Sequence, residues 1–110
     1  MNNTLFNMQY EEIIQSINNH LKQSSKPFYS DFYVGITEDV KKRLFSEHQV
    51  NEKIDWWIYC YADTEEIARE VEKFYIEKGM DGGKGGGKGN GETKYIYCYE
   101  INEHTKERDE

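Results

Sequence analysis

The chain has 110 residues, a net charge of −7 and an apolar content of 36%. This length fits one domain with a single hydrophobic core, to which nine tyrosines, five phenylalanines and two tryptophans add bulk. The acidic charge argues against non-specific binding of nucleic acid, which needs a positive surface, but it is compatible with a local basic groove. The sequence has neither an apolar stretch of membrane-spanning length nor a signal-peptide layout at its start, so we expect a cytoplasmic protein that does not enter a membrane.

The first half of the chain alternates between helical and extended patterns. Apolar residues recur one helical turn apart over residues 8–23, which predicts a helix. The aromatic and β-branched residues 32–36 predict a strand. Thr37 is a favourable N-cap, and it predicts a further helix over residues 38–47 with acidic residues in its first turn.

The second half of the chain continues with a strand, a helix, a loop and a strand. Residues 54–62 alternate between two faces, which predicts the strand, and an apolar stripe predicts the helix over residues 63–78. All but one of the nine glycines lie within residues 79–93, which predicts a glycine-rich loop. Residues 94–101 predict the third strand, and residues 102–110 predict a flexible acidic tail.

One tetrapeptide, Ile-Tyr-Cys-Tyr, occurs at residues 58–61 and again at residues 96–99. Two strands with the same alternation can be neighbours in one sheet, with isoleucine and cysteine facing one layer and the tyrosines facing the other. Cys60 and Cys98 are expected to be free, buried thiols. The sequence therefore predicts one α+β domain over residues 1–101, with a small central three-stranded sheet flanked by helices.

A short motif, Tyr33-Val34-Gly35, ends the first predicted strand. Arg43 follows on the next predicted helix, and Glu72 lies on the third. Glu72 is at the edge of the apolar stripe of its helix, whereas Glu70 is on the solvated side, so Glu72 can point into a cleft. In this order and spacing, residues 32–78 resemble the GIY-YIG nuclease family, whose YIG element is similar to the tripeptide.

The resemblance implies a GIY-YIG-like core and a metal-dependent phosphodiesterase, an endonuclease that acts on nucleic acid with Mg²⁺ or Mn²⁺. It implies catalytic roles for Tyr33 and Arg43 and a metal-binding role for Glu72. Gly35, within the matched motif, and Lys42, a basic neighbour of Arg43, are expected to lie against the substrate. A tyrosine can orient or deprotonate water, an arginine offers a forked donor set to phosphate, and a lone carboxylate can hold one hydrated Mg²⁺. We therefore expect Tyr33, Arg43 and Glu72 to line one concave surface.

The chain departs from the family at its first strand. The family opens with a GIY strand upstream of YIG, and the tyrosine of GIY takes part in catalysis. Here residues 27–29 stand too close to Tyr33 for a normal hairpin, and a predicted helix lies upstream. The C-terminal strand can supply the missing strand by pairing with the strand of Tyr33, which makes the strand order permuted. Tyr97 or Tyr95 then replaces the lost tyrosine as a catalytic residue.

Three further residues are candidates for the site. Many family members place a histidine four residues after the arginine, but His48 follows Arg43 by five. The preferred interpretation of His48 is therefore a histidine at the end of a helix, and a catalytic role is the second interpretation. Lys84 and Lys88 lie in the glycine-rich loop and could bind a phosphate backbone. A simple mobile linker is the stronger interpretation of this loop.

Two classes of function stay open at this point. One is the endonuclease. The other is a non-catalytic module derived from the same scaffold, which binds a protein or nucleotide partner as an inhibitor or adaptor would. The acidic charge and the absent first strand favour the module, whereas the spacing of Tyr33, Arg43 and Glu72 favours the nuclease.

Overall fold

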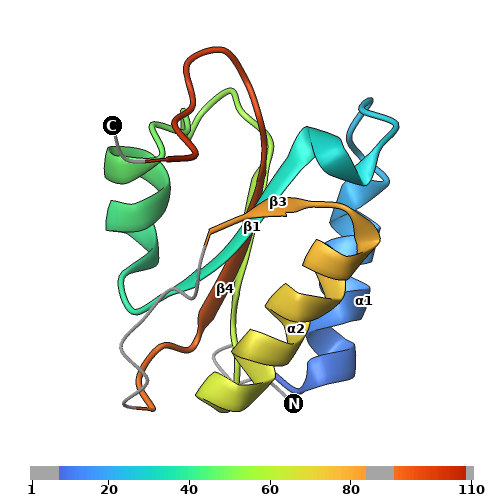
Figure 1. Cartoon of the computed structure of the whole chain (residues 1–110), viewed down its shortest axis with the longest axis vertical. Helices are drawn as coiled ribbons and strands as arrows, with labels where there is room; N and C mark the ends of the chain where they lie inside the picture. The colour runs from blue at the N-terminus through green and yellow to red at the C-terminus, as the bar shows by residue number, and fades with distance from the viewer. Residues whose placement is uncertain (1–7, 84–90, 109–110) are drawn as a thin grey trace.

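The computed structural model describes residues 8–83 and 91–108 of the chain. Two α-helices lie on one face of a central sheet and a π-helical segment lies on the other, as Figure 1 shows. In chain order the elements are α1 (Tyr10–Leu21), the 3-10 turn η1 (Tyr29–Asp31), β1 (Phe32–Thr37), the π-helix η2 (Lys42–Glu47), β2 (Trp57–Tyr61), α2 (Glu65–Lys78), β3 (Asp81–Gly82) and β4 (Tyr95–Glu100). The fold is therefore of the α+β class that the sequence predicts.

The sheet has four strands in the order β2-β4-β1-β3, so the expectation of three strands is corrected. β4 lies between β1 and β2 and runs antiparallel to both, which confirms that the C-terminal strand pairs with the strand of Tyr33. The additional strand, β3, pairs in parallel with β1 through Asp81 and Gly82 alone. Its pairing uses main-chain groups within the glycine-rich segment, where side chains carry no strand pattern.

The two faces of the sheet carry different side chains, as the repeated tetrapeptide predicts. Tyr59 pairs with Tyr97, and Cys60 pairs with Ile96, across the β2–β4 ladder. The aliphatic and cysteine side chains pack under α1 and α2, whereas tyrosines pack toward η2. Both cysteines are free and buried, as expected. The sheet thus divides the interior into an aliphatic core and an aromatic core.

The two α-helices match their predicted positions. Thr64 begins α2 by accepting a hydrogen bond at its hydroxyl from the Ile67 amide at 3.1 Å. Gly79 ends α2 with a φ of 122°, a conformation that favours glycine. Within the described ranges, no helix combines the length and the apolar content that a membrane crossing requires.

The helix predicted over residues 38–47 is π-helical over most of its length. The His48 amide donates to the Arg43 carbonyl at 2.9 Å, a bond that spans five residues in place of four. The wider turn brings residues five apart onto one face of the helix. Arg43 and His48 therefore project toward the same side, although their spacing is too long for an ordinary α-helical turn.

The segment after β4 packs against the domain, where the sequence predicts a flexible acidic tail over residues 102–110. We call its described part, residues 102–108, the C-terminal strap. Thr105 is 7% exposed, and the Lys106 amide donates to the His48 carbonyl at 2.8 Å. Arg108 pairs with Asp81 at 2.8 Å. The strap thus connects the end of η2 with β3, on the upper left of Figure 1.

Candidate active site

A small cleft collects side chains from β1, η2, α2 and β4. We call it the tyrosine cleft. Its volume is about 40 Å³, and the residues that line it include Tyr33, Gly35, Arg43, Glu72, Gly83 and Tyr97. An adjoining hollow of about 140 Å³ shares Tyr33, Arg43 and Gly83 and adds His48 and part of the strap. The expected convergence of Tyr33, Arg43 and Glu72 on one concave surface is therefore present. Distant parts of the sequence form this surface because β4 lies beside β1.

Gly35 makes room for Tyr97. The two residues face each other across the β1–β4 ladder, and the ring of Tyr97 covers the position that a side chain at residue 35 would occupy. A Cβ at residue 35 would lie 2.6 Å from Cζ of Tyr97, which is far below a normal contact distance. Tyr95, the other candidate for the replaced tyrosine, packs against Tyr59 and Tyr61 and does not line the cleft. Of the two tyrosines, Tyr97 is the one at the site.

A chain of hydrogen bonds connects Arg43 to His48 through Tyr97. Nε of Arg43 donates to the Tyr97 hydroxyl at 3.3 Å, and that hydroxyl lies 2.8 Å from Nε2 of His48. Nδ1 of His48 lies 2.6 Å from the Lys106 carbonyl, which can only accept, so Nδ1 carries the ring proton. Nε2 is therefore the acceptor for the Tyr97 hydroxyl. Burial of His48, together with the charge of Arg43, lowers the pKa of the imidazole, although the Lys106 carbonyl opposes the shift.

The two tyrosines of the cleft are neutral phenols. Tyr33 stacks on Tyr99 with ring centroids 5.2 Å apart, and its hydroxyl points toward Gly83. Burial raises the pKa of Tyr33, while the charges of Arg43 and Arg108 act in the opposite direction. Burial likewise raises the pKa of Tyr97. A phenol in this environment loses its proton only to a positioned base, and His48 is placed to be that base for Tyr97.

Arg43 is two-thirds buried and remains charged. Its Nη1 atom pairs with Glu47 at 2.6 Å, and its side chain is 34% exposed. Burial lowers the pKa of this guanidinium, but the hydrogen bonds to Glu47 and Tyr97 outweigh that effect and raise it. The exposed part of the fork is therefore available to an anionic group that enters the cleft.

Glu72 is a buried carboxylate that borders the cleft. It is 8% exposed, and burial raises its pKa while the charge of Arg69 acts against that shift. Among the described residues, no group of three or more metal-ligating side chains is present. A cation at Glu72 would therefore take its other ligands from water or substrate, which fits Mg²⁺ or Mn²⁺ better than a metal that needs a full protein cage.

Lys42, which is also expected at the site, lies outside the cleft. Lys42 is exposed and lies 4.0 Å from Glu47, and it does not line either hollow. Lys84 and Lys88 are outside the described residues. The strap residues Lys106 and Arg108 line the adjoining hollow, but no pattern in the sequence predicts them as site residues. Lys106 contributes main-chain atoms, which no residue pattern can reveal.

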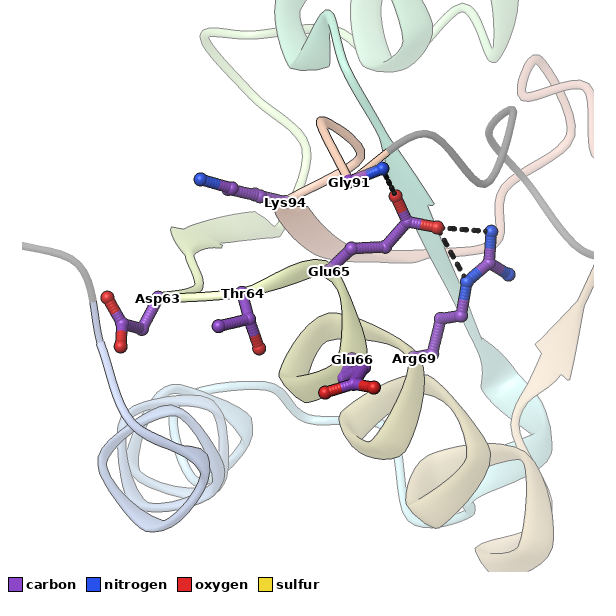
Figure 2. Close-up of a pocket in the computed structure, with 7 residues that line it drawn as sticks. All are labelled: Asp63, Thr64, Glu65, Glu66, Arg69, Gly91 and Lys94. Carbon is purple, nitrogen blue, oxygen red and sulfur yellow. Dashed lines mark hydrogen bonds and ion pairs between the residues drawn. The ribbon is translucent and has the colours of Figure 1, made fainter.

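A larger hollow of about 420 Å³ lies at the start of α2, away from the tyrosine cleft. Figure 2 shows Glu65 at its centre, where the carboxylate accepts from the Gly91 amide at 2.8 Å and pairs with Arg69 at 2.7 Å. These contacts fasten the end of the glycine-rich segment to α2. Because the buried carboxylate of Glu65 is fully engaged with such partners, we assign it a structural role.

The chain matches no protein-family model, no curated protein and no solved structure. A function for the chain is therefore inferred from the geometry and chemistry of the tyrosine cleft.

Proposed function

We propose that the chain is a metal-dependent phosphodiesterase of the GIY-YIG type, an endonuclease that acts on nucleic acid at the tyrosine cleft. The observation that carries this proposal is the convergence of Tyr33, Arg43, Glu72 and Tyr97 on one cleft. These residues come from four separate elements, and each is of a type that phosphodiester hydrolysis requires. A set assembled only for packing would have no need of an arginine and a buried carboxylate on the same surface.

The position of β4 supports a permuted form of the family core. β4 is antiparallel to β1 and occupies the middle of the sheet. A C-terminal strand in this place can substitute for the GIY strand that the N-terminal half lacks. Tyr97, opposite Gly35 of the tripeptide, then takes the place of the GIY tyrosine.

The chain's own residues account for substrate binding and proton transfer. Arg43 would bind a non-bridging oxygen of the scissile phosphate through the exposed part of its guanidinium. Tyr97 would take a proton from the attacking water as its own hydroxyl proton passes to Nε2 of His48. Nε of Arg43 stabilises the charge that develops on the Tyr97 oxygen. The hydroxide formed in this way attacks phosphorus, and the ester bond to the leaving oxygen breaks.

Glu72 is the residue that would hold Mg²⁺ or Mn²⁺. Bound there, the ion would neutralise charge on the phosphoryl oxygens and the leaving group. The carboxylate is at the edge of the cleft, and the positive charge of Arg69, on the same helix, partly opposes the rise in its pKa. Burial raises the pKa of Glu72 by disfavouring the bare carboxylate, and a positive ion beside it would offset that cost.

The decisive experiment is a cleavage assay with single-stranded, double-stranded and branched DNA and RNA, in Mg²⁺ or Mn²⁺. Arg43→Ala should lower the rate by about a hundredfold or more, because loss of one preorganised donor costs roughly 3 kcal/mol of transition-state stabilisation. Lys22→Ala removes a positive charge from the exposed end of α1, on the opposite face of the sheet, and should leave the rate unchanged. Equal cleavage by wild type and Arg43→Ala would assign the activity to a contaminant and overturn the proposal.

A second function, a non-catalytic module that binds a protein partner, has its own support. The net charge is −7, and Nη1 of Arg43 is already paired with the Glu47 carboxylate at 2.6 Å. This alternative expects no cleavage with any substrate or metal from a correctly folded protein. It also expects Arg43→Ala and Lys22→Ala to behave alike in every nuclease assay.

A further inference from the structure

The geometry points to the C-terminal strap as a positioning element of the active site: its contacts fix which nitrogen of His48 carries the proton. The catalytic meaning of this inference rests on the proposed function. The proton position itself is a property of the folded protein and can be measured without any activity. The two claims can therefore fail separately.

Lys106 binds His48 at two points through its main chain. The Lys106 amide donates to the His48 carbonyl at 2.8 Å, and the Lys106 carbonyl accepts from Nδ1 of His48 at 2.6 Å. Because a carbonyl cannot donate, this contact is satisfied only when Nδ1 is protonated. The same arrangement leaves the lone pair of Nε2 facing the Tyr97 hydroxyl at 2.8 Å.

Tyr99 is a competitor for the same nitrogen. Its hydroxyl lies 3.0 Å from Nδ1 of His48 and could donate to that atom if its proton pointed there. A proton donated by Tyr99 would require an unprotonated Nδ1 and would move the ring proton to Nε2. His48 could then no longer accept from Tyr97, and Tyr97 would lose its base.

Glu107 removes this competition. Its carboxylate accepts from the Tyr99 hydroxyl at 3.0 Å, so the Tyr99 proton points away from His48. The Thr105 hydroxyl, on a residue that is 7% exposed, lies 2.7 Å from the same carboxylate oxygen and 2.9 Å from the Asn102 carbonyl, so its single proton can serve either acceptor and helps to hold Glu107 when it points to the carboxylate. Two contacts of the strap thus favour a proton on Nδ1 of His48. One is made by the Lys106 carbonyl, and the other is made by the Glu107 carboxylate through Tyr99.

The surroundings of His48 contain charges of both signs. Arg43 and Glu47 face it from η2, and Glu107 faces it from the strap. The rings of Tyr33, Tyr97 and Tyr99 pack around it from β1 and β4. Any variant must therefore be compared at a pH at which the ring is neutral, so that only the position of the proton changes.

The test is long-range ¹H–¹⁵N NMR on the full chain with ¹⁵N-labelled histidine, at neutral pH. A protonated nitrogen and an unprotonated nitrogen of a neutral imidazole differ strongly in ¹⁵N shift, so the spectrum identifies the proton position directly. For wild type, we expect the proton of His48 on Nδ1. For Glu107→Ala, we expect a substantial shift of the population toward Nε2. His20, which lies on α1 and is hydrogen-bonded to the Trp57 carbonyl rather than to the strap, serves as a control within each spectrum.

A double variant separates this mechanism from general loosening of the fold. Glu107→Ala with Tyr99→Phe lacks both the carboxylate and the competing hydroxyl, so it should return the proton to Nδ1. A wild-type proton on Nε2 would overturn the inference at once, even if no variant folds. An unchanged proton position in Glu107→Ala would overturn the role of Glu107.

Kinetics connect the inference to the proposed function. If wild type cleaves nucleic acid, Glu107→Ala should lower kcat tenfold or more with little change in KM, and the double variant should recover most of that loss. A cleavage rate unaffected by a shifted proton would overturn the positioning role. Absence of cleavage by wild type would refute the proposed function and leave the NMR result standing.

Discussion

Gly35 and Tyr97 face each other across the β1–β4 ladder, and the phenol ring of Tyr97 occupies the space above the glycine. This relationship places the Tyr97 hydroxyl between Arg43 and His48. It also explains in physical terms why the tripeptide needs glycine at its third position. Neither residue has a positive φ that would require glycine, so glycine is needed at residue 35 because the Tyr97 ring leaves no space for a side chain there.

Gly35→Ala should destabilise the fold and displace the Tyr97 ring. A Cβ at residue 35 would lie 2.6 Å from Cζ of Tyr97, a ring carbon that cannot move without its whole side chain. Overpacking of this kind costs roughly 1–3 kcal/mol, measurable by urea unfolding. Gly83→Ala is the matched control, because its Cβ would lie 2.7 Å from the Tyr33 hydroxyl, the outer end of a side chain, and 4.0 Å from the ring carbon Cζ. A smaller loss for Gly35→Ala than for Gly83→Ala would contradict this account of the cleft.

Glu72→Gln should raise the free energy of unfolding at neutral pH. Burial raises the pKa of Glu72 in the folded state, so its ionisation costs stability at any pH above that folded-state value. The cost fades as the pH falls toward the unfolded-state pKa of about 4.3, below which the carboxyl is neutral in both states. The gain from Glu72→Gln should therefore be present at pH 7 and absent near pH 4. Glu70→Gln, on the exposed side of the same helix, should show no such pH-dependent gain.

Divalent metal offers a test of the same carboxylate that needs no substrate. If Glu72 holds Mg²⁺, then Mg²⁺ at ten times its Kd should add about 1.4 kcal/mol to the free energy of unfolding and raise the melting temperature. Glu72→Gln should abolish that rise, and Glu70→Gln should keep it. An equal rise in both variants would place the metal elsewhere and remove Glu72 from the proposed role.

Periodicity in the sequence was enough to locate both α-helices and the three long strands. The alternation in residues 58–61 and 96–99 even predicts which strands are neighbours, because aliphatic and aromatic side chains separate onto opposite faces. The choice between Tyr95 and Tyr97 could not be made in this way. Both tyrosines lie on the same face, and only the register against Gly35 brings Tyr97 into the cleft.

The features that sequence reasoning missed depend on main-chain atoms. β3 pairs with β1 through the backbone of Asp81 and Gly82, and the π-helical bond runs between the main chains of His48 and Arg43. The strap acts on His48 through the Lys106 carbonyl. Side-chain patterns carry little information about such contacts, because any residue type can supply an amide or a carbonyl.

The pH dependence of stability should contain a contribution from His48. Burial lowers the pKa of His48 in the folded state, so the unfolded chain binds the proton first as the pH falls below about 6.5. Stability is therefore retained above the unfolded-state pKa and decreases as the pH falls toward the folded-state value. His48→Gln removes this contribution, so its free energy of unfolding should change less than that of wild type between pH 7.5 and 5.5. Identical slopes for the two proteins would show that His48 is not a buried neutral base.

Deleting residues 103–110 should leave a folded but weakened domain. The deletion removes the hydrogen bonds of Lys106 to His48, the hydrogen bond between Glu107 and Tyr99, and the ion pair of Arg108. It also exposes His48 to solvent, whereas this residue is 2% exposed in the intact chain. At about 1 kcal/mol for each hydrogen bond, the loss should be roughly 2–4 kcal/mol by urea unfolding. Deletion from Lys94 onward instead removes β4, the strand that joins β1 to β2, and should prevent folding altogether.

Arg108→Ala is the control for this truncation. It removes a surface ion pair with Asp81 and a long hydrogen bond, 3.4 Å, to the Glu107 carbonyl, which together should cost less than about 1 kcal/mol, and it leaves both contacts of Lys106 with His48 in place. The truncated chain should also lose the part of the pH dependence assigned to His48, because water would then reach the imidazole and its pKa would rise toward the ordinary value. Arg108→Ala should retain that pH dependence. A truncated chain with wild-type stability and wild-type pH dependence would mean that the strap neither buries His48 nor positions its proton.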